Sequence, residues 1–323
     1  MKKEDLRIVF MGTPEFAVGS LKALVEGGYN VVAVVTQPDK PVGRHGSVLR
    51  APEVKEYALS VGLPVLQPEK MKNPDFVAEL ASYKADLQVV VAFRMLPEVV
   101  WDMPRFGTFN VHASLLPQYR GAAPINWAVI NGDTETGVTT FFLDHEIDTG
   151  RIIMQRKFDI PDNADVEYVY DGLMRLGAEV CLQTVDEIVS TDGHVDTFAQ
   201  ISDVDLRPAP KIFKETCRID CTRTAKQIYD FIRGLSPYPG AWTPLVRNGE
   251  KLSTLKIFQT VKTGRQCVLP AGTLLAENGR LYLATADEWL EIAEIQMSGK
   301  KRMPVRDFLN GFKNIEECRL GEV

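Results

Sequence analysis

The sequence contains little cysteine and no long hydrophobic run. Its 323 residues include five cysteines, an odd number scattered over the second half of the chain, which argues against a disulfide framework. No apolar run approaches the length that crosses a bilayer, and the segment Leu6–Phe10 is too short for the core of a signal peptide. With an ordinary composition, 45% hydrophobic and 25% charged, these absences predict a cytoplasmic protein with no membrane partner.

Metal ligands at a familiar spacing are also missing. The spacing of Cys217 and Cys221 could suit a metal, but no second pair of cysteine or histidine follows, and all four histidines lie upstream of both. Because structural zinc sites need four ligands, the sequence predicts no metal.

Signatures of dinucleotide binding and of covalent catalysis are absent too. Gly12–Phe16 supplies one glycine where the dinucleotide fingerprint needs three, and Pro14 lacks the N–H that a phosphate would bind, so a nicotinamide dehydrogenase is a poor fit. A tight turn at Gly12, with Thr13 as N-cap and Pro14 as the first helical residue, is the simpler interpretation. No Gly-x-Ser-x-Gly elbow is present, which favours direct transfer between two bound substrates over a covalent intermediate.

The charge of the chain is divided unevenly. Residues 1–206 carry 18 Lys and Arg against 30 Asp and Glu, a net charge of −12, whereas residues 207–323 carry 19 against 13, a net charge of +6. An acidic first part joined to a basic second part indicates that the second part binds a polyanion.

The order of apolar patterns predicts an α/β fold with two domains. Nearly continuous apolar strands alternate with helices in the first half, which is typical of a mostly parallel sheet covered on both faces, as in a doubly wound, Rossmann-like domain. The later short strands predict a small OB-like β-barrel. We expect the first domain to span residues 1–189, a linker residues 190–207, and the second domain residues 208–323. The expected strands are Arg7–Phe10, Val31–Val35, Pro64–Leu66, Leu87–Ala92, Phe109–His112, Val138–Leu143 and Ile152–Arg156, then Leu252–Phe258, Ala271–Leu275, Leu281–Ala284 and Leu290–Ile295. The expected helices are Phe16–Glu26, Pro52–Leu59, Pro74–Ser82, Val166–Ile188, Thr224–Arg233 and Val305–Gly311.

The most informative segment is Phe109–Pro124. Residues two apart on a strand face the same side, so Asn110 and His112 should project together near the carboxyl end of their strand. Open α/β sheets place their chemistry at that end. An amide can donate a hydrogen bond to a developing oxyanion, and an imidazole can donate or shuttle a proton, so the pair suits acyl transfer.

A histidine in such a pair needs an orienting carboxylate. We expect it from the loop after the next strand, which should open at the same edge of the sheet as His112. Asp148, in a tight turn before Thr-Gly, is the preferred residue. Asp144, His145 and Glu146 remain alternatives that spacing alone cannot rank.

At these residues the chain resembles the folate-dependent formyltransferases. The Asn-x-His-x-Ser-Leu-Leu-Pro run and the downstream Asp-Thr-Gly look like the catalytic signature of that family. Three further segments are similar to the branch of the family that acts on methionyl-tRNA, namely Met11–Ala17, Thr36–Arg44 and Leu115–Pro124. Pro237–Trp242, in the second part, is similar to the second-domain pattern of the family. The resemblance implies a Rossmann-like formyltransferase domain followed by a basic OB-like domain.

The resemblance also implies the reaction. The formyl donor would be 10-formyltetrahydrofolate, and the acceptor would be the α-amino group of methionine on initiator tRNA, in a monomeric enzyme without a metal. Asn110 and His112 would hold the formyl oxygen as it becomes an oxyanion. Asp148 would keep His112 oriented and help to remove the proton of the amine.

Binding residues follow from the same resemblance. The folate site would consist of Ser114, Leu115, Leu116 and Pro117, with Phe93, Arg94, Met95 and Leu96 offering backbone groups to the pteridine. Gly12, Thr13 and Phe16 would face the methionine side chain, and Arg44, in the long segment Gln37–Lys55, would contact the acceptor stem. The chain departs from the family twice. Arg94 stands where a glycine is usual, and His45–Ser47 replaces a basic Gly-Lys-Lys, which predicts fewer phosphate contacts and a shallower salt dependence.

Three other functions are compatible with parts of the sequence. A sugar-nucleotide formyltransferase shares the Asn-x-His motif and a similar second domain, but lacks the segments around Gly12 and Arg44. A glycinamide ribonucleotide formyltransferase has a single domain. A non-catalytic RNA-binding protein fits the charge division, but gives no reason for Asn110, His112 and Asp148 to occur together.

Overall fold

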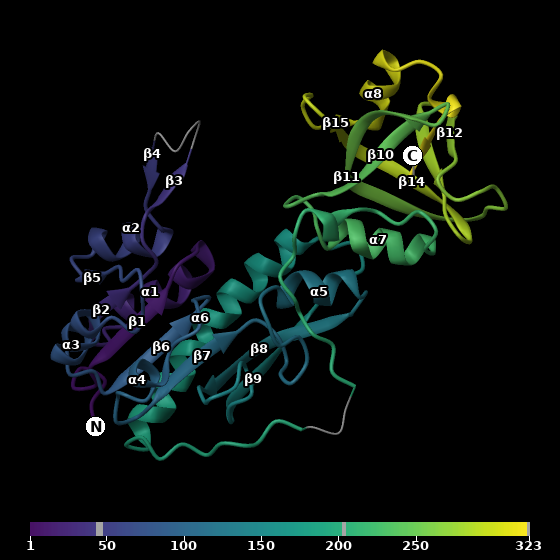
Figure 1. Ribbon diagram of the computed structural model, residues 1–323. Coiled ribbons are helices and arrows are strands. Elements are labelled where there is room, and N and C mark those ends of the chain that lie inside the picture. The colour runs from purple at the N-terminus through teal and green to yellow at the C-terminus, as the bar shows by residue number, and fades with distance from the viewer. Residues whose placement is uncertain (43–47, 202–204, 322–323) are drawn as a thin grey trace. The chain divides into compact units, whose positions relative to one another are not determined.

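The computed structural model describes residues 1–42, 48–201 and 205–321 (Figure 1). The chain divides into two compact units. The first contains residues 1–121, 136–159 and 170–208, and the second contains residues 122–135, 160–169 and 209–323.

The first unit is built on a seven-stranded sheet with the strand order β5-β2-β1-β6-β7-β8-β9. The five strands from β5 to β7 are parallel, and β8 runs antiparallel to β7. This confirms the mostly parallel sheet predicted from the sequence. The strands are β1 (Ile8–Gly12), β2 (Val31–Val35), β5 (Val65–Leu66), β6 (Leu87–Val91), β7 (Thr108–His112), β8 (Glu135–Phe142) and β9 (Ile152–Asp159).

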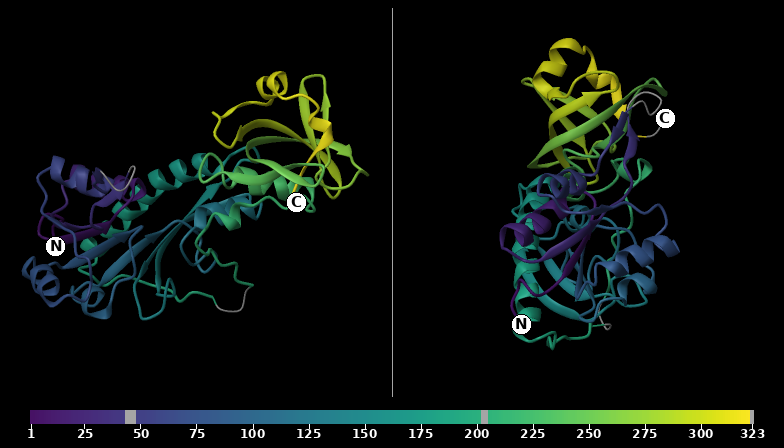
Figure 2. Two further views of the ribbon diagram at one scale, coloured as in Figure 1. Left: turned by 45° about the horizontal axis from the view of Figure 1, so that its top comes forward. Right: turned by 90° about the vertical axis from the view of Figure 1, so that its left-hand side faces the viewer.

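Helices lie on both faces of this sheet (Figure 2). They are α1 (Glu15–Glu26), α2 (Glu53–Ser60), α3 (Pro74–Ser82), α4 (Glu98–Trp101) and the long α6 (Val166–Ser190). All five residues of β1 are buried, and alternate ones, Val9 and Met11, pack in one apolar cluster with Phe76 and Leu80 of α3. A strand that is buried on both sides has no polar alternation, which is why these strands are continuous apolar runs in the sequence.

Two local features of the first unit differ from the prediction. Helix α1 begins at Glu15, with Pro14 in the N-cap position and no capping side chain, so the prediction of Thr13 as N-cap is wrong. The hydroxyl of Thr13 is instead buried without a hydrogen-bond partner among the described residues. The segment Gln37–Lys55 also contains an exposed hairpin that the sequence did not predict, made of β3 (Lys40–Val42) and β4 (Val48–Arg50).

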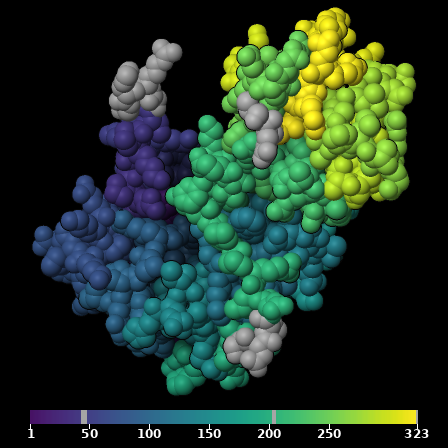
Figure 3. Space-filling view, turned by 45° about the vertical axis from the view of Figure 1, so that its right-hand side comes forward, coloured from purple at the N-terminus to yellow at the C-terminus, as the bar shows by residue number. Residues whose placement is uncertain are grey.

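The second unit contains an antiparallel sheet with the order β12-β13-β14-β11-β10-β16, and β15 pairs with β14. The backbone N–H of Leu320 donates to the carbonyl of Gly272 (2.9 Å), and Thr273 bridges to Arg319, so the two edges of the sheet meet and close a small barrel. In the space-filling view of Figure 3 the residues of these strands are coloured from green to yellow. The strands are β10 (Ala241–Arg247), β11 (Glu250–Gln266), β12 (Leu274–Glu277), β13 (Arg280–Ala284), β14 (Glu288–Met297), β15 (Met303–Pro304) and β16 (Cys318–Leu320).

Within the described residues, three complete α-helices belong to this unit, α5 (Pro124–Ile130), α7 (Ala225–Arg233) and α8 (Val305–Gly311). Helix α5 is tied to the end of α7, because the side-chain amide of Asn126 donates to the carbonyl of Gly234 (2.9 Å). The barrel core includes Ile228 and Ile232 of α7. The turn Asn278-Gly279 joins β12 to β13 with positive φ at both residues, as a two-residue type I′ hairpin turn requires.

The amino end of α7 has two caps. Thr224 and Gln227 form a capping box, and the carboxylate of Asp287 accepts a hydrogen bond from the backbone N–H of Ala225 (2.8 Å). This bond, together with a weaker one from Thr285, lowers the pKa of Asp287 below its ordinary value. A carboxylate at the positive end of a helix stabilises the helix only while it is ionised.

Replacement of Asp287 by alanine should therefore reduce stability at neutral pH by about 1 kcal/mol, the usual value of a cap. Because the folded-state pKa lies below that of the unfolded chain, the contribution is present above the unfolded pKa, near pH 4, and is lost as the pH falls through the folded pKa. Urea unfolding of both proteins between pH 7 and pH 3 measures this difference. Equal stability at pH 7 would contradict the capping role.

All five cysteines are free and buried, and burial raises the pKa of Cys181 and of Cys221 to about 12, so both thiols are neutral at physiological pH. Across the ranges that the structure describes, no helix combines the length and apolar character needed to cross a membrane.

Candidate active site

Three parallel strands bring the predicted site residues to one edge of the sheet. Gly12 at the end of β1 pairs with Val91 at the end of β6, and Val91 pairs with Val111 of β7. The residues that follow these strands therefore start from the same edge. These are the turn into α1, the segment after β6, and the Leu-Leu-Pro loop after His112.

Asn110 and His112 both lie on β7 and point to the same side of it. The side-chain oxygen of Asn110 is buried and has no hydrogen-bond partner within the described residues. An unsatisfied buried polar atom costs about 1–3 kcal/mol. Because an amide can turn by half a rotation, the same position can also present the NH₂ group, so the side chain is free to bind a ligand oxygen.

His112 is 7% exposed, and its Nε2 lies 2.9 Å from the backbone oxygen of Tyr119. A carbonyl oxygen only accepts, so Nε2 carries the proton in this arrangement, and Nδ1 is the acceptor when the ring is neutral. The ring packs edge-on against Phe141, with the centroids 6.4 Å apart. The structure therefore holds the imidazole in one orientation, with Nε2 directed at the Tyr119 carbonyl.

Asp148 lies in the loop between β8 and β9. Because β8 is antiparallel to β7, this loop begins beside the amino end of β7, where Leu143 N–H donates to Thr108 O (2.8 Å). The prediction that the loop opens at the same edge as His112 is wrong for this reason. The Asp148 carboxylate nevertheless reaches the segment after His112, accepting a hydrogen bond from the N–H of Gly121 (3.0 Å).

His112 and Asp148 thus bind the same short segment two residues apart, at Tyr119 and at Gly121. Within the described residues their side chains do not bond to each other. Asp144, by contrast, accepts hydrogen bonds from Glu146 N–H (3.1 Å) and the Thr149 hydroxyl (2.8 Å) and so stabilises the loop itself.

His145 and Glu146 are exposed. The imidazole of His145 lies 3.9 Å from the carboxylate of Glu98. Of the four alternatives in this loop, Asp148 is the residue whose side chain contacts the segment that also binds His112.

The loop of Ser114, Leu115, Leu116 and Pro117 is fixed by two residues that the sequence did not single out. The hydroxyl of Thr139 donates to the Ser114 carbonyl (2.6 Å) and accepts from Leu116 N–H (3.1 Å). The amide of Gln155 donates to the Leu116 carbonyl (2.8 Å). Thr139 is one of three buried threonines in β8, so its polarity alone does not distinguish it in the sequence.

The segment after β6 contains Phe93, Arg94, Met95 and Leu96. The guanidinium of Arg94 donates to the carbonyl of Glu69 (2.9 Å) and to that of Pro68, and burial lowers its pKa. Met95 is 71% exposed, whereas Leu96 is buried in the core. The Arg94 side chain, which replaces the usual glycine, is therefore bonded to the segment before α3. It does not cover the backbone groups of residues 93–96.

Gly12, Thr13 and Phe16 lie where β1 meets α1. A side chain at Gly12 would come within 2.6 Å of the Ala17 Cβ, so close packing alone requires glycine. Phe16 is buried and packs edge-on against Tyr170, with ring centroids 5.3 Å apart. Arg44 lies outside the described residues.

Positive φ at non-glycine residues also occurs in these segments. Eight non-glycine residues in the described ranges have positive φ, and three of them are Ala92 (47°), Tyr119 (60°) and Asp148 (56°). Such a conformation costs about 1–3 kcal/mol and is typical of functional sites. All three residues lie next to groups assigned to the site.

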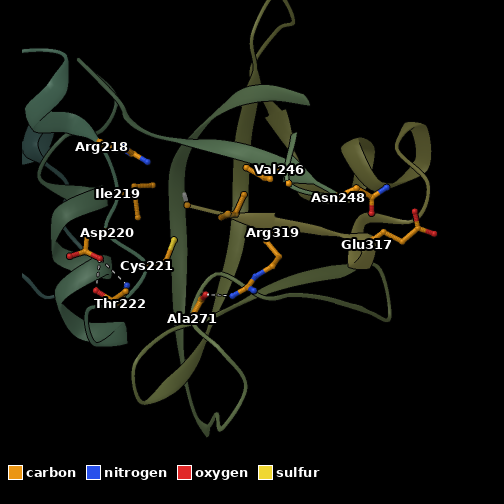
Figure 4. A pocket seen from close by; sticks show the side chains of 13 residues that line it. Arg218, Ile219, Asp220, Cys221, Thr222, Val246, Asn248, Ala271, Glu317 and Arg319 are labelled. Atoms are coloured by element: carbon orange, nitrogen blue, oxygen red, sulfur yellow. Dashed lines mark hydrogen bonds between the residues drawn. The ribbon is translucent and has the colours of Figure 1, made fainter. Parts of the chain in front are cut away.

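A separate hollow of about 620 Å³ lies in the second unit (Figure 4). Two pairs of its lining residues bond to each other, since Arg319 donates to the Ala271 carbonyl (3.0 Å) and Asp220 accepts from the Thr222 hydroxyl (2.6 Å). None of the predicted catalytic or folate-binding residues lines it.

Comparison with known proteins gives consistent results over the whole chain. The family described as "Formyl transferase" matches residues 6–185, and "Formyl transferase, C-terminal domain" matches residues 211–313. A protein of Parabacteroides distasonis named methionyl-tRNA formyltransferase is 61% identical, and the alignment covers 99% of this chain and all of that protein. A protein of the same name from Flavobacterium johnsoniae is 46% identical, with 98% and 99% covered.

Solved structures share the fold at low identity. The sugar 3N-formyltransferase WlaRD, crystallised with dTDP and 5-N-formyl-THF, has a TM-score of 0.62 at 17% identity, and covers 92% of this chain and 99% of its own. HypX from Aquifex aeolicus, solved with tetrahydrofolic acid, has a TM-score of 0.61 at 19% identity. The alignment covers 96% of the present chain and 48% of HypX, about half of its length.

Proposed function

The chain belongs to the family of the methionyl-tRNA formyltransferases, and from that premise we propose that it transfers the formyl group of 10-formyltetrahydrofolate to the α-amino group of methionine on initiator Met-tRNA. The observation that carries this proposal is 61% identity to a protein of that name along nearly the entire chain, both parts included. The fold of tetrahydrofolate-bound HypX supports a folate donor.

The proposed reaction is direct transfer through a tetrahedral intermediate. The amine attacks the formyl carbon, the bond from that carbon to N10 of the folate breaks, and the proton lost by the amine is delivered to N10. Asn110 would donate its amide N–H to the formyl oxygen, and its unpartnered position on β7 supports this role. His112 would donate from Nε2 once the Tyr119 carbonyl is replaced by the ligand. Asp148 would hold the positive charge and orientation of His112 during the proton transfer.

The folate site would be formed by Ser114–Pro117 and by the backbone of residues 93–96. Thr139 and Gln155 support this assignment because they hold the first segment rigidly. Gly12, Thr13 and Phe16 would enclose the methionine side chain, and the buried, unpartnered hydroxyl of Thr13 is available there. Arg44 would bind phosphates of the acceptor stem.

We assign residues 1–189 to catalysis, residues 190–207 to a linker, and residues 208–323 to tRNA binding, in a cytoplasmic monomer. The net charge of +6 over residues 207–323 supports the last assignment, because phosphate contacts dominate affinity for nucleic acids. Lys211 and Lys214 are exposed and flank Phe213, which is 58% exposed. Such a combination of lysine and aromatic side chains suits an RNA backbone and its bases.

Replacement of both Lys211 and Lys214 by alanine should reduce the slope of log affinity for Met-tRNA against log salt by about 2, one unit for each lost phosphate contact. Lys70→Ala with Lys72→Ala is a matched control, since both are exposed lysines of the acidic part. Filter binding at several salt concentrations measures the slope. An unchanged slope, or an equal change in the control, would count against tRNA binding by this segment.

The function itself is tested by mixing the purified protein with 10-formyltetrahydrofolate and aminoacylated initiator tRNA. Formylmethionyl-tRNA is the expected product. Formylation of an amino-sugar nucleotide in its place would favour the sugar-nucleotide alternative. Tight tRNA binding without any product would favour a non-catalytic RNA-binding protein.

A further inference from the structure

One glutamine outside every motif connects the loop that carries Asp148 to the segment Tyr119–Gly121. The Gln200 side-chain nitrogen donates to the backbone oxygens of Asp148 (2.8 Å) and Gly150 (2.9 Å). Its oxygen accepts two hydrogen bonds from one guanidinium, those of Arg120 Nε (3.1 Å) and Nη2 (2.6 Å). The amide therefore uses both donors and both acceptor positions.

This pattern allows a single orientation of the amide. If the group were turned by half a rotation, its NH₂ would face the Arg120 guanidinium and its oxygen would face two carbonyls, so every contact would be repulsive. Gln200 itself is held by the short antiparallel bridge between Phe198 and Ile152, whose N–H and C=O groups exchange bonds of 2.8 and 3.0 Å. A residue of the expected linker is thus fixed against the start of β9.

The bonds of Gln200 complete a closed cycle of contacts that links Arg120, Asp148 and Gly121. Arg120 lies between Tyr119, whose carbonyl binds His112, and Gly121, whose N–H binds the Asp148 carboxylate. Gln200 joins Arg120 on one side to the backbone of Asp148 on the other. It therefore restrains both the backbone of Asp148, which has positive φ, and the segment whose carbonyl binds Nε2 of His112.

We propose that Gln200 is a positioning residue for formyl transfer, holding Asp148 and the segment Tyr119–Gly121 in register through Arg120. This inference rests on the proposed function of the site. Gln200 reaches neither His112 nor the Asp148 carboxylate directly, so its effect on catalysis passes through the backbone. Displacement of reacting groups by about 1 Å can cost on the order of 10² in rate, so a lost restraint here should be measurable.

The variant Gln200→Glu separates the two halves of the restraint. A carboxylate keeps an attractive partner for Arg120 but cannot donate to the Asp148 and Gly150 carbonyls. We expect kcat to fall about 10-fold or more, with KM for Met-tRNA within about twofold of the wild type. Gln118→Ala is the matched control, because Gln118 ties the same loop to residues 205 and 207 without contacting Asp148. It should retain wild-type kcat.

Two further measurements distinguish positioning from a general loss of structure. If Gln200 acts through Asp148, the double variant Gln200→Glu with Asp148→Asn should be no slower than Asp148→Asn alone, whereas independent effects would multiply. Hydrogen exchange of the peptide covering residues 144–151 should be faster in Gln200→Glu than in the wild type or Gln118→Ala. Unchanged exchange, or multiplying losses of rate, would overturn the proposal. The exchange result does not depend on whether the wild type formylates tRNA, so the two proposals fail separately.

Discussion

Replacement of Asn110 or of His112 by alanine should each lower the turnover of formyl transfer by at least about 10², while Met-tRNA affinity stays close to that of the wild type. The loss of one oxyanion donor or one acid–base group has this magnitude. The two side chains lie on the same side of β7, so each is placed to contact one carbonyl oxygen. Single-turnover rates with saturating folate and tRNA measure the chemical step.

Matched controls separate chemistry from folding. His194→Ala removes an exposed imidazole in the turn that follows α6, and Asn73→Ala removes an amide that caps α3. Both controls should form product at the wild-type rate. If tRNA affinity falls as far as turnover in Asn110→Ala or His112→Ala, those residues bind the acceptor and the assigned catalytic role is wrong.

The edge of the sheet that carries the site could be predicted from the sequence, but the direction of β8 could not. Continuous apolar runs and the i, i+2 spacing of Asn110 and His112 were sufficient to place these two residues on a buried strand. The apolar run at Val138–Leu143 is the same whether the strand is parallel or antiparallel to its neighbour. Direction depends on long-range pairing, here Phe109 with Phe142 and His112 with Thr139, which no local pattern records.

The barrel strands show a second limit of sequence patterns. Strand β11 runs over 17 residues, but its pairing with β14 shifts register three times, between Ile257 and Gln259, between Gln259 and Thr260, and between Lys262 and Gln266. Each bulge interrupts the period of two, so the alternation predicted only Leu252–Phe258. Strand β10 was missed because it contains Pro244, which argues against a strand interior.

Residues that position other residues are not marked by a recognisable sequence pattern. Gln200 lies in a polar stretch without periodicity, and Arg120 belongs to a loop; their contact spans 80 positions. Thr139 is one of several polar residues in β8. Their roles depend on which backbone groups come within hydrogen-bond reach after folding. The residues that contact reacting atoms can be recognised by chemical type, whereas those that hold them can be recognised only from geometry.

The variant Asp148→Asn is expected to lower turnover by about 10² to 10³ without loss of stability, within the usual range for a missing acid–base partner. Asparagine keeps an oxygen that can accept the Gly121 N–H, and the backbone bonds of Gln200 to Asp148 and Gly150 do not involve the side chain. The loop should therefore stay in place, and the measured loss would report the missing negative charge rather than a displaced loop.

Asp144→Asn provides the comparison that decides between the acidic residues of this loop. Asp144 accepts bonds from Glu146 N–H and the Thr149 hydroxyl, both of which an asparagine oxygen can still accept, and it contacts nothing that binds His112. The turnover of the Asp144→Asn variant should stay near that of the wild type. Melting temperatures and single-turnover rates of both variants complete the test. If Asp144→Asn loses as much turnover as Asp148→Asn at equal stability, the negative charge of the whole loop matters, and no single carboxylate can be assigned to His112.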